Sequence, residues 1–126
     1  MTRSRFQFQM IAILSGFLVF VGLRIAAASD PDHVARFRTT HQCSGCDLSK
    51  AQLGGIVAPK AKLANANLTD ANLYGARLPG ADLTGAILTG TDLKMADLSG
   101  AVGAVLGGAL TDARTTCPDG TTGPCR

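Results

Sequence analysis

The sequence predicts a solenoid, in which the chain bends after every fifth residue so that one leucine per quintet joins a shared buried column. From Cys46 to Gly100 the chain divides into eleven quintets, and ten of them have leucine at the third position. Alanine stands first in eight of the eleven. A period this short and this regular is typical of a repeat protein, where each unit contacts only its neighbours.

The third-position leucines are the predicted core, and no other leucine occurs in this stretch. They are Leu48, Leu53, Leu63, Leu68, Leu73, Leu78, Leu83, Leu88, Leu93 and Leu98. Five residues of α-helix turn through about 500°, so leucines at this spacing would scatter around a helix axis. Along a straight strand, side chains alternate between faces, and half of the leucines would be wet. Both regular structures are therefore excluded, and each quintet must be one structural element.

The other positions of the quintet agree with a common inside and outside. The first position suits a cramped inward slot, and its alanines are Ala51, Ala61, Ala66, Ala71, Ala76, Ala81, Ala86 and Ala96. The second position is mostly polar and is expected to face water, as with Asp47, Asn67, Asn72, Asp82, Asp92 and Asp97. Glycine is frequent at the fifth position, where it eases the bend.

The quintets ANLTD, ANLYG and ADLTG resemble the A(D/N)LXX motif of the pentapeptide-repeat family, and the resemblance covers 55 of the 126 residues. It implies an all-β fold, a right-handed quadrilateral β-helix with four units per coil and just under three coils. The first and third side chains of each unit would point inward. Residues twenty apart would then stack, so that Lys62 would meet Asp82 and Arg77 would meet Asp97.

Quintet 56–60 is the one irregular unit inside the repeat. Ile56 occupies the small slot, Ala58 the leucine slot, and Pro59 follows. We interpret this as a tolerated irregularity in which two slots exchange volume. A bulge or a recognition site is the alternative.

The segments on either side of residues 46–100 are expected to close the solenoid. Residues 30–45 form an N-terminal capping segment, because Asp30 followed by Pro31 is typical of a helix start. Val34 and Phe37, three residues apart, would turn the same face of this short helix toward the first coil. After Gly100 the register is lost, and residues 101–126 are expected to form a C-terminal cap and a disulfide-closed tail.

Residues 1–29 read as a signal peptide or an N-terminal anchor. Arg3 and Arg5 precede an apolar run over residues 10–23, and small residues follow at 26–29. The run is 14 residues long, short of the ~20 needed to span a bilayer. We therefore expect export to the periplasm or the extracellular space, with membrane contact only if this segment is retained.

The net charge of +3 belongs to that segment. Without Arg3, Arg5 and Arg24 the chain carries nine basic and nine acidic residues. A neutral remainder gives no reason to expect nucleic-acid binding.

Four cysteines in a short exported chain favour two disulfides. Extending the quintet frame backwards places Cys43 in a leucine slot and Cys46 in an alanine slot, while Cys117 and Cys125 flank a turn. The two ends of the repeat lie too far apart for a bond unless the tail folds back, so we prefer Cys43 with Cys46 and Cys117 with Cys125.

Two chemical alternatives exist for the Cys43-Ser44-Gly45-Cys46 motif. Its spacing is that of a redox motif, although a period-five coil is not the usual context for one. His41 could complete three ligands of a metal site. Haem attachment is excluded, because Asp47 rather than histidine follows the second cysteine.

No catalytic motif occurs, and Asp82, Asp92 and Asp97 recur at a position that serves solubility. We expect no catalytic, cofactor or metal residues. The predicted function is that of an exported, non-enzymatic module for structure or for binding an unknown protein partner. One alternative, suggested by some longer members of the family, is a DNA-mimicking topoisomerase-binding protein, which needs an acidic surface and a cytoplasmic address. The other is a thiol oxidoreductase using Cys43 and Cys46.

Overall fold

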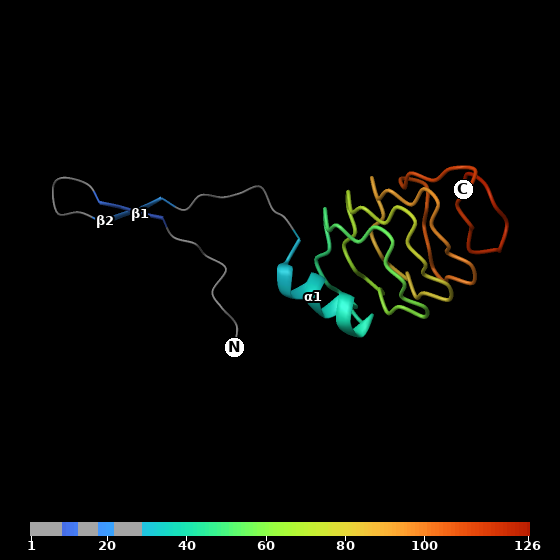
Figure 1. Cartoon of the computed structure of the whole chain (residues 1–126), viewed down its shortest axis with the longest axis horizontal. Coiled ribbons are helices and arrows are strands. Elements are labelled where there is room, and N and C mark those ends of the chain that lie inside the picture. The colour runs from blue at the N-terminus through green and yellow to red at the C-terminus, as the bar shows by residue number, and fades with distance from the viewer. Residues whose placement is uncertain (1–8, 13–17, 22–28) are drawn as a thin grey trace.

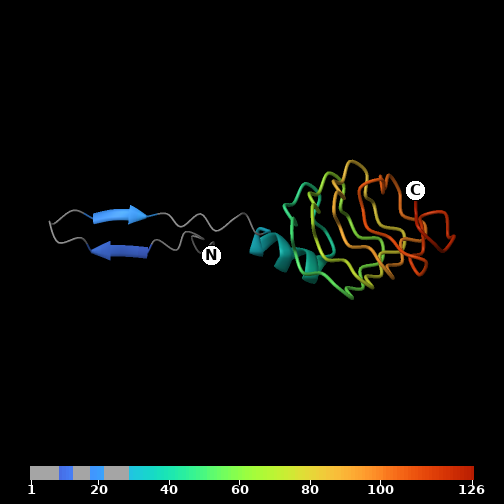
Figure 2. The ribbon, with the colours of Figure 1, turned by 90° about the horizontal axis from the view of Figure 1, so that it is seen from above.

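The computed structural model describes residues 9–12, 18–21 and 29–126. Strands β1 (Gln9–Ala12) and β2 (Leu18–Val21) pair antiparallel, with Gln9 opposite Val21. Helix α1 (Pro31–Thr40) covers one end of a stack of coils, and the C-terminus lies at the other end (Figure 1; Figure 2). The predicted signal segment, residues 1–29, falls largely outside the described residues. Within the described ranges, no helix combines the length and the apolarity needed to cross a bilayer.

Helix α1 begins where the sequence indicates. The Asp30 carboxylate accepts hydrogen bonds from the backbone amides of Asp32 (2.9 Å) and His33 (3.2 Å), and Pro31 is the first helical residue. These amides have no partner inside the helix, so the cap stabilises its start. The helix ends at His41, whose left-handed conformation (φ 57°) turns the chain into the first coil.

The coil repeats every twenty residues, which is four quintets. Parallel bridges join residues at this spacing, for example Gln42 with Lys62 and Lys62 with Asp82. We name the four sides by their quintets. Side 1 holds the quintets that begin at residues 41, 61 and 81, side 2 those at 46, 66 and 86, side 3 those at 51, 71 and 91, and side 4 those at 56, 76 and 96.

Each quintet contributes one bridging residue and then turns. The sides are therefore too short to form extended strands, and the expected all-β character takes the form of isolated bridges linked by turns. This follows from the period itself, since a chain that bends at every fifth residue leaves room for a single pair per side.

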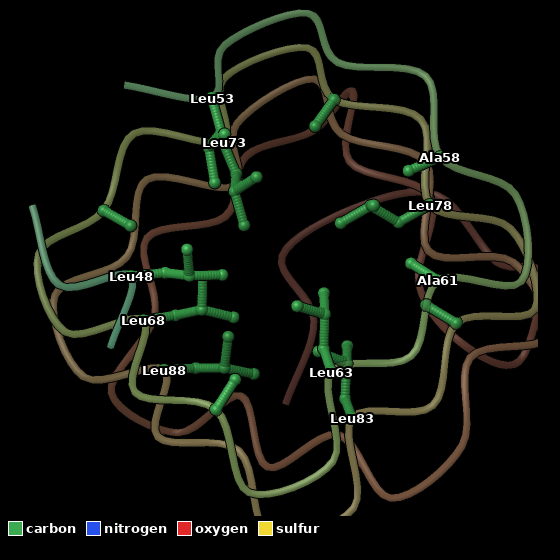
Figure 3. Packing of buried hydrophobic residues seen from close by; sticks show 14 of the residues in the cluster. Leu48, Leu53, Ala58, Ala61, Leu63, Leu68, Leu73, Leu78, Leu83 and Leu88 are labelled. Carbon is green, nitrogen blue, oxygen red and sulfur yellow. The ribbon is translucent and has the colours of Figure 1, made fainter. Parts of the chain in front are cut away.

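The leucine column fills the interior. In Figure 3 leucines from different sides point toward one another, and Leu48, Leu68 and Leu88 lie in one stack. All ten third-position leucines of the repeat are at most 3% exposed. Phe37 of α1 is fully buried in the same cluster, so the helix closes the open end of this column with an aromatic side chain.

The corners are built by turns with a left-handed residue at the fifth position. The Ala51 amide donates to the Leu48 carbonyl (3.1 Å), and the equivalent bond recurs along the coil. Glycine is not always needed for the positive φ, because Lys50 (φ 59°) and Lys60 (φ 55°) adopt it as well. Stacking demands glycine at position 103, where a Cβ atom would lie 2.6 Å from the Thr84 Cα atom of the coil below.

Quintet 56–60 keeps the regular path. Ala58 is fully buried in the leucine slot, and Ile56 packs partly buried against the core. The next turn is regular, with the Ala61 amide bonded to the Ala58 carbonyl (3.2 Å). The quintet is therefore not a bulge.

The coil does not stop where the sequence repeat stops. Asp82 bridges Val102 at the usual spacing, whereas Asp92 bridges Leu110 and Asp97 bridges Thr116 at spacings of eighteen and nineteen residues. Leu106 is 5% exposed and joins the core. Residues 101–118 thus form a shortened coil, in which deletions hide the register from a search for quintets.

The tail then closes one side of the stack. Thr116 pairs antiparallel with Thr122, and the Cys117 amide donates to the Thr121 carbonyl (2.8 Å). These bonds satisfy backbone groups that would otherwise face the end of side 4.

Candidate functional surfaces

The CxxC motif is closed and buried. Cys43 and Cys46 form a disulfide with a Cα–Cα distance of 5.2 Å, and the two residues are 0% and 2% exposed. The Cys43 sulfur lies 3.4 Å from the carbonyl oxygen of His33, beneath α1. A partner thiol would have to displace the helix to reach this bond, so the geometry favours a structural disulfide over a redox centre.

The two histidines serve the junction between α1 and the first coil. His33 Nδ1 accepts a hydrogen bond from the Asp47 amide (3.1 Å). His41 is the C-terminal cap residue of α1, and its ring lies edge-on to Phe37 at 6.3 Å between centroids. Across the part of the chain that the structure describes, no three side chains of His, Cys, Asp or Glu come together as metal ligands.

The second disulfide closes the tail and borders a cavity. Cys117 and Cys125 are bonded with a Cα–Cα distance of 5.6 Å. A cavity of about 420 Å³ lies between this disulfide, Leu106 and the prolines Pro118 and Pro124. Polar residues, among them Asp119, Thr121 and Arg126, line it together with these apolar ones, and it lies at the C-terminal end of the stack.

The second-position Asp and Asn residues have a structural role beyond solubility. The Oδ1 atom of each accepts a hydrogen bond from the backbone amide two residues later, for example Ser49 to Asp47 (3.0 Å) and Thr69 to Asn67 (3.1 Å). The same bond occurs at Asn72, Asp82, Asp92 and Asp97. These are Asx turns, which fix the corner that follows. The recurring D/N-x-x triplet could have indicated them from sequence.

Proline provides a second solution for the same corner. Pro59 and Pro79 occupy the fourth position of quintets whose second residue is Val57 or Arg77. Proline has no amide hydrogen to donate to an Asx side chain, but it presets the backbone angle of the turn. In both of these quintets, therefore, the fourth position lacks the donor and the second position lacks the acceptor.

The second-position carboxylates bond to their own corners and lie apart from one another. Hydrogen bonds from the Thr84 side chain and amide lower the pKa of Asp82, and those from the Ser99 amide and side chain lower the pKa of Asp97. Asp82, Asp92 and Asp97 lie on sides 1, 3 and 4. The structure therefore brings together no pair of them that could share a proton for acid–base chemistry.

The bases and acids that were predicted to stack are neighbours in adjacent coils, but their charged groups do not contact each other. Lys62 bridges Asp82 and Arg77 bridges Asp97, and each base contributes to the lowered pKa of its neighbour. In residues 29–126 neither pair comes close enough to form an ion pair. Each carboxylate is instead turned toward the amide of its own corner.

Two buried threonines occupy the small slot. Thr91 Oγ1 donates to the Leu68 carbonyl (2.7 Å), and Thr115 Oγ1 donates to the Leu93 carbonyl (3.1 Å). Both residues are fully buried. The first position thus accepts a hydroxyl when a carbonyl of the coil below lies within reach, which the alanine preference alone does not reveal.

A stack of four-quintet coils with a leucine interior and Asx corners defines a class of repeat protein, and comparison with known proteins places the chain in it. The family model for pentapeptide repeats matches residues 42–78 and 66–102, with eight copies. The crystal structure of alr5209, a pentapeptide repeat protein from Nostoc Pcc 7120, is 31% identical over 70% of this chain and 84% of that one, with a TM-score of 0.52. The chain belongs to the pentapeptide-repeat family, whose fold is a right-handed β-helix.

More distant similarities are of the same kind. Rfr23, a pentapeptide repeat protein from the cyanobacterium Cyanothece 51142, is 22% identical over 68% of this chain and 97% of that one, with a TM-score of 0.33. A pentapeptide repeat protein from the Arabidopsis thaliana thylakoid lumen is 29% identical over 50% of this chain and 55% of that one, with a TM-score of 0.20. No curated protein matches the chain.

Proposed function

We propose that the chain is an exported, non-enzymatic scaffold that acts as a structural element or binds a protein partner in the periplasm or outside the cell. The observation that carries the proposal is that the groups able to do chemistry are occupied by the fold. The four cysteines are in disulfides, and the second-position carboxylates hold their own corners. A four-sided rod that is closed at one end by α1 is suited to present flat faces.

Export is supported by two independent features. Disulfides persist in oxidising compartments and are rare in the cytosol. The basic residues and the apolar run before α1 have the order of a secretory signal. We place no cofactor in the protein, and we expect membrane contact only through residues 10–23 if they are retained.

The surface charge argues against the DNA-mimic alternative. Such a protein needs a continuous acidic surface to compete for a DNA site. Here the lower parts of sides 1 and 4 carry Lys60, Lys62 and Arg77 instead. The oxidoreductase alternative loses support because its two cysteines form a disulfide that is buried beneath α1.

Cell fractionation with N-terminal sequencing tests the proposal. We expect the protein in the exported fraction, with a start near Ser29 if the signal is cleaved. A cytoplasmic protein that retains Met1 would refute export. A thiol titration and an insulin-reduction assay test the absence of redox activity, and turnover that depends on Cys43 would refute a purely structural role.

A further inference from the structure

Helix α1 and its flanking residues bond to the second-position residue at the exposed edge of the first coil on three of its sides. On side 1 the Gln42 amide donates to Thr40 Oγ1 (3.2 Å). On side 2 the Asp47 amide donates to His33, and the Asp47 carbonyl accepts from the Asp30 amide (3.3 Å). On side 3 the Gln52 carbonyl accepts from the Arg38 guanidinium.

Side 4 is different, because its edge has no cover. Within the coil, a second-position residue directs both its amide and its carbonyl to the coil below, as Arg77 does toward Ile56 (2.7 Å) and Ala58 (2.8 Å). Val57 is the second residue of the lowest quintet on this side. Its amide and carbonyl therefore point away from the stack, and so does the Pro59 carbonyl.

Among the described residues, none of these three backbone groups has a hydrogen-bond partner. The Val57 side chain is 55% exposed. Residues 56–60 thus form an open strand edge with one donor and two acceptors in a row. Such an edge is a template for another extended chain.

The surroundings of this edge are basic. Lys60 follows it at the corner, Arg77 bridges Val57 from the coil above, and Lys62 begins the next side. All three bases are exposed. Quintets 41–45, 56–60, 61–65 and 76–80 contain no acidic residue. Lys62 and Arg77 have Asp82 and Asp97 next to them in the coil above, whereas Lys60 stacks below Gly80, so the edge itself is positively charged and the acids lie farther up the stack. An acidic segment would be attracted to this edge.

The end of the stack favours a single extended chain over a second solenoid. Added strands pair at a spacing of about 4.8 Å, while a helix with its side chains is about 10 Å across. Because α1 lies on the same end (Figure 1), it would hold a second copy of the stack away from the Val57 edge. A lone peptide strand meets no such obstacle.

We infer that residues 56–60 bind an extended, acidic segment of a partner protein as an added β-strand. The strand would bond to Val57 and Pro59, and its carboxylates would face Lys60, Lys62 and Arg77. This inference rests on the proposed role as a binding module and names the chemistry of the partner. Peptide addition to a sheet edge obtains affinity from main-chain hydrogen bonds and selectivity from side chains.

The test uses the full chain and a panel of labelled seven-residue peptides that alternate glutamate with valine, threonine or serine. Binding is measured by fluorescence anisotropy. We expect saturable binding that weakens with salt, and loss of binding when the same peptides carry N-methylated amides. If no peptide of the panel binds, or if N-methylation has no effect, the inference is overturned.

Two pairs of variants locate the site. Val57→Pro removes the edge amide, whereas Val57→Thr keeps it with a similar shape, so we expect about tenfold weaker binding for the first and little change for the second. Lys60→Glu should weaken binding on the order of fivefold. Lys50→Glu is the matched control, since Lys50 is also exposed, left-handed and at a corner of the first coil.

Circular dichroism must show that each variant is folded. Equal effects of Val57→Pro and Val57→Thr, or of the two lysine variants, would overturn the inference. So would a homodimer in sedimentation that Val57→Pro dissociates, because the edge would then pair with a second copy. These outcomes leave the proposed export and the scaffold role untouched, since fractionation and thiol assays decide those.

Discussion

Truncation of one leucine near the middle of the column gives the sharpest test of how this solenoid is stabilised. Leu73 is fully buried and lies between Leu53 and Leu93 in the stack on side 3. Burying a leucine side chain contributes ~1.5 to 3 kcal/mol, and the cavity left by Leu73→Ala adds to the loss. The core is narrow and its walls are held by bridges above and below, so collapse around the cavity is restricted. We expect a loss of about 3 kcal/mol.

Urea unfolding followed by circular dichroism measures this loss as a lower midpoint at unchanged slope. Leu110→Ala is the matched control, because Leu110 belongs to the coil but is 48% exposed, and its truncation should cost no more than about 0.5 kcal/mol. Leu73→Asp should abolish the fold, since a domain of this size has only ~5 to 15 kcal/mol in total. Equal losses for Leu73→Ala and Leu110→Ala would refute the claim that a buried leucine column dominates stability.

Three further changes test other parts of the structure. Asp97→Asn should make the free energy of unfolding depend less on pH in the acid range. The pKa of Asp97 is lowered in the folded state, so the ionised carboxylate stabilises the fold at neutral pH, and this stabilisation is lost as the pH falls through that pKa. Thermal melts between about pH 2 and pH 7 measure this, and an unchanged profile would contradict it. Replacing both Cys117 and Cys125 by serine should lower the free energy of unfolding by about 2 kcal/mol, because it frees an eight-residue loop. Urea unfolding without reductant measures this loss, and no change in stability would show that hydrogen bonds alone hold the tail. Ala58→Leu alone should destabilise by ~1 to 3 kcal/mol through overpacking, while Ala58→Leu with Ile56→Ala should stay within about 1.5 kcal/mol of the parent; a double variant worse than the single one would disprove the exchange of volume.

The sequence predicted those features that depend on a strict period. Leucine at every fifth position excludes helix and strand and requires a common interior, and the structure places these leucines there. Asp30 and Pro31 marked the helix start because capping is a local interaction. The pairing of Cys43 with Cys46 in the structure follows from their slots in the extended frame.

The five-residue period could not predict features that depend on residues far apart in the sequence. The coil continues past Gly100 with spacings of eighteen and nineteen residues, and no quintet search can follow a register that changes its length. Lys62 and Asp82 align as expected, yet the carboxylate prefers the nearby Thr84 amide, which is fixed by the backbone, to a flexible lysine that must be ordered. The open edge at Val57 could not be read from sequence, because it depends on where α1 ends.

The twenty-residue register restricts how a protein of this kind can change in length. Duplication of four quintets would leave every side chain above and below on its original face and would only move the two ends apart. Duplication of a single quintet would rotate everything after it by a quarter turn relative to α1. The Val57 edge and the tail cavity would then face new directions with respect to each other, although every leucine stayed buried. Duplication of four quintets therefore preserves the relative orientation of the surfaces, whereas duplication of a single quintet changes it.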